Sequence, residues 1–178
     1  DIIKPVDQEL PFIGGAVRKG FESAQGDYYL MMASDLETDP RLVKDMIAKA
    51  QANEADIITA SRWLPGGGFD DYHPFKRLCN RLFQLIFSVL YLVNLSDMTY
   101  GFRILKKELV NRIQWQELRH PIFFETLLKP IRLGYRVAEL PARWECRQEG
   151  ESQISVWDYF DYFKIGFMLR FAKIEAHD

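Results

Sequence analysis

The chain reads Gly-Asp-Tyr-Tyr-Leu-Met-Met-Ala-Ser-Asp-Leu-Glu-Thr-Asp-Pro over residues 26–40, and this stretch decides the predicted fold. The apolar run at 28–32 is too short for a helix and is bounded by polar residues, so it is predicted to be a buried strand. Asp35, Glu37 and Asp39 follow at its carboxyl end, where open α/β sheets bind their ligands. We expect carboxylates this close together to hold a divalent metal ion, and the metal in turn to contact a phosphate-bearing substrate.

Asp39 has a second explanation as a helix cap. Thr38 or Asp39 offers a side-chain oxygen to the free amides of a helix start, and Pro40 suits the first helical position. Capping does not account for Asp35 and Glu37. These two lie two residues apart on a segment expected to be extended, so both side chains should point the same way. Asp35 and Glu37 are therefore the predicted metal ligands.

Length, charge and cysteine content limit the classes of protein. With 178 residues, the chain is long enough for one domain with a substantial core. Its 23 basic and 25 acidic side chains nearly balance, which argues against nucleic acid as the main partner. Cys79 and Cys146 match no zinc or redox spacing, so a reduced, cytosolic setting is expected. The most apolar run, residues 82–95, is interrupted by polar side chains and is too short to span a membrane.

Strand-like and helix-like segments alternate along the chain. Short apolar runs predict strands over residues 2–4, 28–32, 56–61, 101–105, 137–140 and 142–145. Amphipathic spacing predicts helices over residues 14–24, 40–53, 76–93, 123–133 and 156–173. A glycine-rich loop is expected over residues 62–73. This alternation predicts an α/β fold with a mainly parallel sheet flanked by helices.

The start of the chain is unusual for such a fold. A doubly wound domain normally devotes its first two strands to the base of a nucleotide, but here no complete strand-helix-strand unit precedes the acidic stretch. We therefore expect a fragment whose α/β domain is truncated at the amino terminus. Two parts are predicted: this domain over residues 1–155, and a carboxyl-terminal amphipathic aromatic helix over residues 156–178.

Cationic side chains recur in loops that follow predicted strands. Arg62 directly follows one strand, and Gly67 lies among three glycines that would let the backbone approach a ligand closely. A surface loop without function is the alternative. Arg77 and Arg81 share one face of a predicted helix near its start, where positive charge opposes the helix dipole. A bound phosphate would compensate for this, and a solvated basic face is the alternative.

Three further groups are candidates for a site. Asp97 and Arg103 belong to one polar cluster that enters a predicted strand, where Arg103 either pairs with Asp97 or contacts a ligand. Glu125 sits on an apolar helix face, so its carboxylate is expected either to pair with an arginine or to be kept available for catalysis. Arg147 and Ser152 lie in a polar loop that either closes over a phosphate or serves as a linker.

These residues together resemble a known family. Ala-Ser-Asp-Leu-Glu-Thr-Asp-Pro at 33–40 resembles the metal motif Asp-Ala-Asp-Leu-Gln-x-x-Pro of family 2 glycosyltransferases, which have a GT-A fold. Within that family, the likeness is greatest to polyprenyl-phosphate (dolichyl-phosphate) sugar transferases. Further stretches that resemble family motifs, in the same order, lie at residues 14–21, 60–62, 77–80, 97–103 and 147–152.

The resemblance implies a metal-dependent, inverting transfer of a sugar from a UDP- or GDP-sugar to a polyprenyl phosphate. Asp35 and Glu37 would hold Mg²⁺ or Mn²⁺ against the diphosphate. The predicted catalytic set adds Arg77, as a phosphate ligand, and Glu125, as the base if the acceptor is a hydroxyl. The residues predicted to bind substrate are Arg62, Gly67, Asn80, Asp97, Arg103, Arg147 and Ser152.

Two positions depart from the family pattern. Ala33 stands where the family often has an aspartate, and Gln153 stands where a phosphate-binding lysine is common. These departures leave two alternatives open. One is a family 2 transferase that acts on a saccharide hydroxyl, and the other is a catalytically silent GT-A domain that serves as a binding module.

The last predicted helix suits a membrane surface. Its many aromatic side chains are accompanied by basic ones, a combination typical of the lipid headgroup region. Packing of this aromatic face on the sheet is the alternative. We expect a cytoplasmic protein that is peripheral on the cytoplasmic face of a membrane. The sequence leaves open a homodimer across an unprotected sheet edge.

Overall fold

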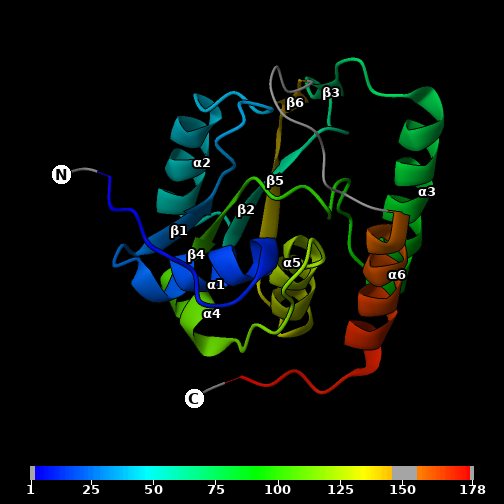
Figure 1. The fold of residues 1–178 in the computed structure, drawn as a ribbon. Helices are drawn as coiled ribbons and strands as arrows, with labels where there is room; N and C mark the ends of the chain where they lie inside the picture. The colour runs from blue at the N-terminus through cyan, green and yellow to red at the C-terminus, as the bar shows by residue number, and fades with distance from the viewer. Residues whose placement is uncertain (1–2, 146–155, 177–178) are drawn as a thin grey trace.

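The computed structural model describes residues 3–145 and 156–176 and shows a sheet between layers of helices (Figure 1). The helices are α1 (Phe12–Ser23), α2 (Leu42–Gln51), α3 (Pro74–Tyr91), α4 (Lys107–Arg112), α5 (Ile122–Arg132) and α6 (Val156–Phe171). The strands are β1 (Tyr28–Met31), β2 (Ile57–Ser61), β3 (Gly68–Phe69), β4 (Arg103–Lys106), β5 (Val137–Pro141) and β6 (Arg143–Trp144). The α/β fold class predicted from the sequence is confirmed.

Four strands form the main sheet in the order β1-β4-β2-β5. β2 and β5 pair in parallel, whereas β4 pairs antiparallel with both β1 and β2. β1, β2 and β5 therefore run in one direction and end at the same edge of the sheet, with β4 running against them. The acidic stretch follows β1 and Arg62 follows β2, so the sheet brings these two loops to one edge. β1 is an outer strand of the sheet, and a homodimer through it stays a prediction.

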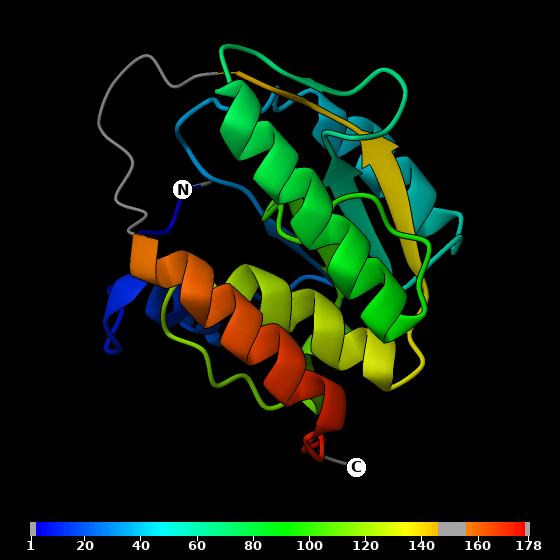
Figure 2. The same ribbon diagram turned by 90° about the vertical axis from the view of Figure 1, so that its right-hand side faces the viewer.

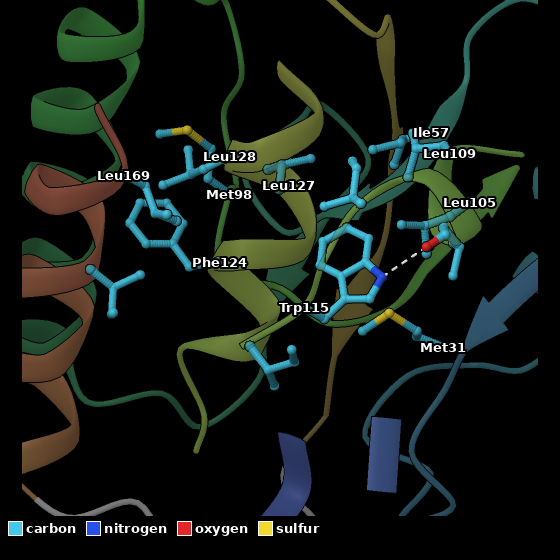
Figure 3. Packing of buried hydrophobic residues seen from close by; sticks show 14 of the residues in the cluster. Met31, Ile57, Met98, Leu105, Leu109, Trp115, Phe124, Leu127, Leu128 and Leu169 are labelled. Atoms are coloured by element: carbon cyan, nitrogen blue, oxygen red, sulfur yellow. Dashed lines mark hydrogen bonds between the residues drawn. The ribbon is translucent and has the colours of Figure 1, made fainter. Parts of the chain in front are cut away.

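The two faces of the sheet bury different apolar clusters. Ile57 on β2 and Leu105 on β4 belong to the larger cluster, which α1, α3, α5 and α6 also line (Figure 3). Their sequence neighbours Ile58 and Ile104 belong to a second cluster beneath α2. This alternation follows from the period of two in a strand whose faces are both covered. A strand buried on both faces need not alternate between apolar and polar residues, which is why the run at 56–61, with Ile57 and Ile58 side by side, predicts β2.

α6 packs against α5 and α3 and completes the larger cluster (Figure 2). The helices approach closely at Gly166, where a Cβ atom would lie 2.2 Å from Phe87 Cε1 and 2.7 Å from Phe124 Cε1. Both phenylalanines are completely buried, so neither ring can move aside without disturbing its neighbours. Ile165 and Leu169 of α6 are buried in the same cluster.

Another side of α6 remains in contact with solvent. Its exposed apolar side chains are Phe160, Phe163, Phe167, Met168 and Phe171. The last helix therefore both packs on the rest of the fold and leaves an aromatic face outside, and the division of the chain at residues 155 and 156 stays a prediction. None of the helices formed by residues 3–145 and 156–176 is both long enough and apolar enough to cross a membrane.

The start of α2 differs from the prediction. The helix begins at Leu42, and its N-cap position is Arg41, which makes no side-chain capping bond. Pro40 is therefore not the first helical residue as predicted, because the helix begins two residues later. Asp39 does offer its side-chain oxygen to a free amide as predicted: it accepts the backbone N–H of Arg41 at 2.9 Å, and it forms an ion pair with the Arg41 guanidinium, so it stabilises the turn before the helix.

The prediction missed two short elements, β3 and α4, and it placed a strand near the amino terminus that the described residues do not form. β3 lies within the stretch predicted to be a glycine-rich loop, where it pairs with β6 in a small second sheet. α4 follows β4 without any intervening turn, and the sequence analysis missed it. Residues 3 and 4 form no strand, and residue 2 lies outside the described part of the chain.

Replacement of Gly166 tests the helix contact. Gly166→Ala is expected to lower the free energy of unfolding by about 1–3 kcal/mol, because the added methyl group would overlap two buried rings. Gly20→Ala in α1 is the control, since a Cβ there meets no atom within 4 Å and alanine is the better helix former. Urea denaturation of both variants measures the effect. Equal stability of Gly166→Ala and the unchanged chain would contradict this packing.

Candidate functional site

The acidic loop (residues 32–39) leaves the carboxyl end of β1. Leu36 has a φ of 57°, in the left-handed region, so the chain turns between Asp35 and Glu37. Asp35 Oδ1 accepts the backbone N–H of Glu37 at 3.2 Å. The two carboxylates therefore belong to one tight turn, which corrects the extended geometry expected from the sequence.

Strand β6 holds the acidic loop in place. Trp144 donates its indole N–H to Glu37 Oε2 at 3.0 Å, although the two residues lie 107 positions apart in the sequence. The backbone N–H of Glu145 donates to the carbonyl of Glu37 at 2.9 Å, and Thr38 forms an antiparallel bridge with Trp144. The position of the Glu37 side chain thus depends on β6 as well as on the loop itself.

Asp35 and Glu37 offer the oxygen ligands that Mg²⁺ and Mn²⁺ prefer. Within the described residues, no group of three or more histidine, cysteine or acidic side chains could hold a metal ion. Mg²⁺ is commonly bound by only one or two carboxylates, with substrate phosphates and water completing its shell. Two carboxylates in one turn fit such a metal, and their metal role stays a prediction.

A buried ion pair closes the end of β2. Arg62 Nε lies 2.7 Å from Asp97 Oδ2, and Arg62 Nη2 lies 2.9 Å from Asp97 Oδ1. The Asp97 side chain is completely buried and that of Arg62 is 10% exposed. Burial alone lowers the pKa of Arg62, but the charge and hydrogen bonds of Asp97 outweigh burial and raise it. Each residue thus has a partner within the protein, and Asp97 pairs with Arg62 rather than with Arg103; the substrate contacts predicted for Arg62 and Asp97 stay predictions.

Gln84 of α3 extends this pair into a buried network. Its amide nitrogen donates to Thr99 Oγ1 at 2.9 Å, and its amide oxygen accepts the backbone N–H of Met98 at 2.8 Å. The helix thereby fixes the loop that carries Asp97. Gln84 was not among the predicted site residues. The only sequence signal for its role is that it is a polar residue within the apolar run at 82–95.

Glu139 of β5 holds the same loop from the other side. Its carboxylate accepts the backbone N–H groups of Ser96 and Asp97, each at 2.9 Å. Ser96 in turn hydrogen-bonds Ser61 at the end of β2, with 2.6 Å between the two hydroxyl oxygens. No sequence pattern indicated this role of Glu139, because it depends on β5 lying beside β2.

Arg103 lies inside the core rather than in the site. Its side chain has no exposed surface, and its guanidinium donates to Thr126 Oγ1 and to the carbonyls of Met98 and Tyr100. Its Nε finds no hydrogen-bond partner in the described part of the chain. Burial lowers the pKa of Arg103 to about 10, against the opposing effect of Asp97. Arg103 therefore ties the segment before β4 to α5, in place of the predicted substrate contact.

Glu125 is committed to structural contacts. Its carboxylate lies 2.6 Å from Lys129 Nζ, and both side chains are almost completely buried. The same carboxylate accepts the backbone N–H of Gln116 at 3.0 Å and that of Glu117 at 2.9 Å. The structure thus favours the pairing alternative, with a lysine in place of the expected arginine. A carboxylate held in this way is not placed to act as the predicted base.

Gly67 approaches the protein's own backbone rather than a ligand. A Cβ atom on it would lie 2.7 Å from the Ser61 carbonyl oxygen and 3.0 Å from that of Ala142. Gly66 has a φ of 92°, and the backbone N–H of Gly68 donates to the carbonyl of Ala142 at 3.1 Å. The glycines therefore let the loop cross the ends of β2 and β5, which explains them without the predicted substrate contact.

Four half-buried aromatic side chains form a row along this edge of the sheet. The aromatic row consists of Trp63, Phe69, Tyr72 and Trp144, with successive ring centroids 4.8, 5.0 and 5.4 Å apart. One end of the row is the tryptophan that binds Glu37, and the other end faces α3. Sequence analysis missed the row, although three of its members lie in the loop predicted to be merely glycine-rich.

Two arginines of α3 lie against the far end of the row. Arg77 Cζ lies 5.5 Å and Arg81 Cζ 5.1 Å from the centroid of the Trp63 ring. Asn80, between them on the helix, accepts the Trp63 indole N–H at 3.0 Å. Asn80 therefore orients a tryptophan, and Arg77 lies at the surface; a ligand role stays a prediction for both residues.

Tyr100 connects the two loops that follow β1 and β2. Its ring lies 4.5 Å from Arg62 Cζ, and its hydroxyl group hydrogen-bonds that of Thr38 in the acidic loop. Burial raises the pKa of Tyr100 to about 12, so its hydroxyl group stays neutral near physiological pH. The predicted site residues Arg147 and Ser152 lie outside the described residues.

Sequence comparison gives the chain several relatives. The model of glycosyl transferase family 2 matches residues 3–114. Glycosyltransferase AglD of Haloferax volcanii is 30% identical over 146 residues, which cover 80% of this chain and 23% of the relative. Dolichol-phosphate mannosyltransferases of Pyrococcus furiosus and Saccharomyces cerevisiae are 27% and 28% identical, over 85% and 90% of this chain. The chain spans 43% and 62% of their respective lengths.

Solved structures share the fold at low sequence identity. Glucosyl-3-phosphoglycerate synthase from Mycobacterium tuberculosis, in complex with phosphoglyceric acid, has a TM-score of 0.66 at 14% identity, over 94% of this chain and 56% of the synthase. The same enzyme with Mn²⁺, UDP and glucosyl-3-phosphoglycerate has a TM-score of 0.64 at 13% identity, with the same coverage. These likenesses confirm the GT-A fold. Since the family model covers more than half of a chain with this fold, the chain belongs to glycosyl transferase family 2.

Proposed function

We propose that the protein transfers a sugar from a nucleotide-sugar to a polyprenyl phosphate with the help of a divalent metal ion. One observation carries the proposal: the aromatic row joins the acidic loop to the two arginines of α3. The acidic loop suits a metal-bound diphosphate, and the arginines suit a second phosphate. A reaction between two phosphate-bearing substrates needs two such regions on one edge of the sheet.

The relatives support both halves of this proposal. Two of them are named dolichol-phosphate mannosyltransferase, which supports a polyprenyl phosphate as acceptor. The structural neighbour binds UDP together with Mn²⁺ or Mg²⁺, which supports a nucleotide-sugar donor and a divalent metal. UDP- and GDP-sugars are both candidate donors.

The proposed chemistry uses few side chains directly. Asp35 and Glu37 would hold Mg²⁺ or Mn²⁺, which would neutralise the charge on the leaving diphosphate. Arg77 would bind the phosphate of the acceptor. A phosphate monoester has a second pKa of about 6, so near neutral pH it is largely ionised and needs positioning more than a base. Direct attack would invert the anomeric carbon, and the commitment of Glu125 to Lys129 agrees with chemistry that requires no base.

An exposed apolar stripe on α3 supports the proposed membrane setting. Its members lie three or four residues apart except for one adjacent pair, and they are Phe75, Leu78, Leu82, Leu85, Ile86 and Val89. The helix contains no acidic residue, and it carries three basic ones in its first half. α6, with its exposed aromatic face, lies beside α3 (Figure 2). Apolar side chains with basic neighbours suit an anionic lipid surface, so we place the protein peripherally on the cytoplasmic face of a membrane.

Nucleotide titration tests the donor side. In calorimetry with UDP and GDP, each with and without Mn²⁺, we expect at least one nucleotide to bind only with the metal. Asp35→Ala should weaken this binding at least about tenfold, because the metal loses a ligand. Asp45→Ala, which removes an exposed carboxylate from α2, is the control. Equal binding by Asp35→Ala would contradict the metal site. Absence of metal-dependent binding would leave two explanations, the incomplete fragment expected from the sequence or a silent binding module, and repeating the titration with the upstream segment restored would decide between them.

The hydrogen bond from β6 to the acidic loop gives a second test. Trp144→Phe keeps a ring beside Tyr72 but removes the N–H that binds Glu37. We expect Mn²⁺-dependent nucleotide affinity to fall roughly three- to tenfold, since a metal ligand loses its orienting partner. Trp63→Phe is the matched control, because it removes an indole N–H that binds α3 instead. An unchanged affinity in Trp144→Phe would show that this bond does not set the ligand's position.

Cosedimentation with lipid vesicles tests the membrane face. Leu85→Glu places a negative charge within the α3 stripe and is expected to reduce binding to vesicles containing phosphatidylserine roughly fivefold or more. Ile47→Glu on α2 is the control, because this exposed residue lies on the opposite side of the sheet. Equal vesicle binding by both variants and the unchanged chain would contradict the proposed surface.

A further inference from the structure

Trp63 occupies a central position between the glycine-rich loop and α3. Its indole N–H is bound by Asn80, and the edge of its ring meets Phe69, whose centroid lies 4.8 Å away. Two guanidinium groups lie against the same ring, those of Arg77 and Arg81. The Trp63 side chain thus contacts Arg77, Asn80 and Arg81, three polar residues that share one face of the helix.

Arg77 and Arg81 differ from Arg62 and Arg143, at the same edge of the sheet, in having no ion-pair partner among the described residues. Arg62 and Arg143 form ion pairs with Asp97 and Asp70. Among residues 3–145 and 156–176, no carboxylate lies within ion-pair distance of Arg77 or Arg81. Both sit in the first half of a helix without acidic residues, where the helix dipole disfavours positive charge. Their charges are thus balanced neither by a described neighbour nor by the helix.

Contact with an aromatic ring leaves a guanidinium able to bind an anion. An ion pair such as that of Arg62 occupies the N–H groups that would otherwise meet a ligand. A guanidinium attracted to the face of an indole keeps its N–H donors directed outward in its own plane. The indole also restricts the long side chain, which lowers the entropy lost when an anion binds. Trp63 therefore has the contacts needed to prepare both arginines for one phosphate group.

We propose that Trp63 is a positioning residue that holds Arg77 and Arg81 together as a pair for the phosphate group of the acceptor. The inference rests on the proposed function and extends it, because it gives Trp63 and Asn80 the task of orienting the two arginines. Trp63 acts through the two arginines and does not itself contact the phosphate. Loss of its ring should therefore weaken binding of a phosphate group while leaving binding of an uncharged isoprenoid unchanged.

Paired binding measurements isolate the phosphate contribution. The affinity of the chain for farnesyl phosphate is divided by its affinity for farnesol, so that contacts with the hydrocarbon cancel. We expect Trp63→Leu to reduce this ratio about tenfold and Trp63→Phe about threefold, since phenylalanine keeps a ring but loses the bond to Asn80. Phe12→Leu is the matched control, because it removes a different ring that lies 4.5 Å from an arginine, Arg119.

A double variant separates positioning from a purely structural role. Arg81→Gln alone should reduce the same ratio, and adding it to Trp63→Leu should change the ratio little further, because Trp63 acts through that arginine. Thermal unfolding and Mn²⁺-dependent nucleotide affinity should be unchanged in Trp63→Phe. Additive losses in the double variant, or a parallel fall in nucleotide affinity, would show a structural role and overturn the inference.

Two outcomes distinguish failure of the inference from failure of the proposed function. If the unchanged chain prefers farnesyl phosphate and Trp63→Leu keeps that preference, the positioning role is wrong and the acceptor proposal stands. If the unchanged chain binds farnesyl phosphate no better than farnesol, the arginine pair is not a phosphate site and the inference fails. In that case the nucleotide titration still decides the donor half of the proposed function independently.

Discussion

The buried ion pair between Arg62 and Asp97 is the contact on which the candidate site depends. It joins the end of β2 to the loop before β4, where almost no water reaches either side chain. Removal of one partner from such a pair commonly costs about 3–5 kcal/mol, because the other charge is left buried. The Arg62 guanidinium also lies 5.0 Å from the Phe69 ring and 4.5 Å from the Tyr100 ring. One side chain thus anchors both the aromatic row and the residue that reaches the acidic loop.

The arginines at this edge of the sheet fall into two groups, those that bind protein atoms and those that lie against aromatic rings. Arg62 and Arg103 direct their donors toward protein atoms, a carboxylate in the first case and carbonyls in the second. Arg77 and Arg81 lie against an indole on the outer side of α3. A buried guanidinium with internal partners fixes the shape of a loop, whereas a guanidinium that lies only against aromatic rings can still bind a phosphate. Similar residues in neighbouring motifs therefore take different roles.

Local patterns predict the fold well and the roles of the site residues poorly. β2 is buried throughout because both of its faces are covered, and its short run of apolar and small residues indicates a strand directly. α4 follows β4 with no turn residue between them, and no local signal marks its start. The carboxylates of Asp35 and Glu37 can be found from their spacing. The contact between Glu37 and Trp144 cannot, because it joins residues 107 positions apart and exists only once β6 is in place.

The same long-range dependence explains why the acidic loop does not hold its shape independently of the rest of the fold. The loop has no regular structure of its own, and its turn places Leu36, a non-glycine residue, in the left-handed region. Its shape is fixed from outside, by Trp144 of β6 and by the hydroxyl group of Tyr100. Both contacts require the sheet edge to be assembled, with β5 beside β2 and the Asp97 loop closed over it. The shape of the acidic loop is therefore a property of the assembled edge, and a change at β6 or at Tyr100 would shift the carboxylates of Asp35 and Glu37.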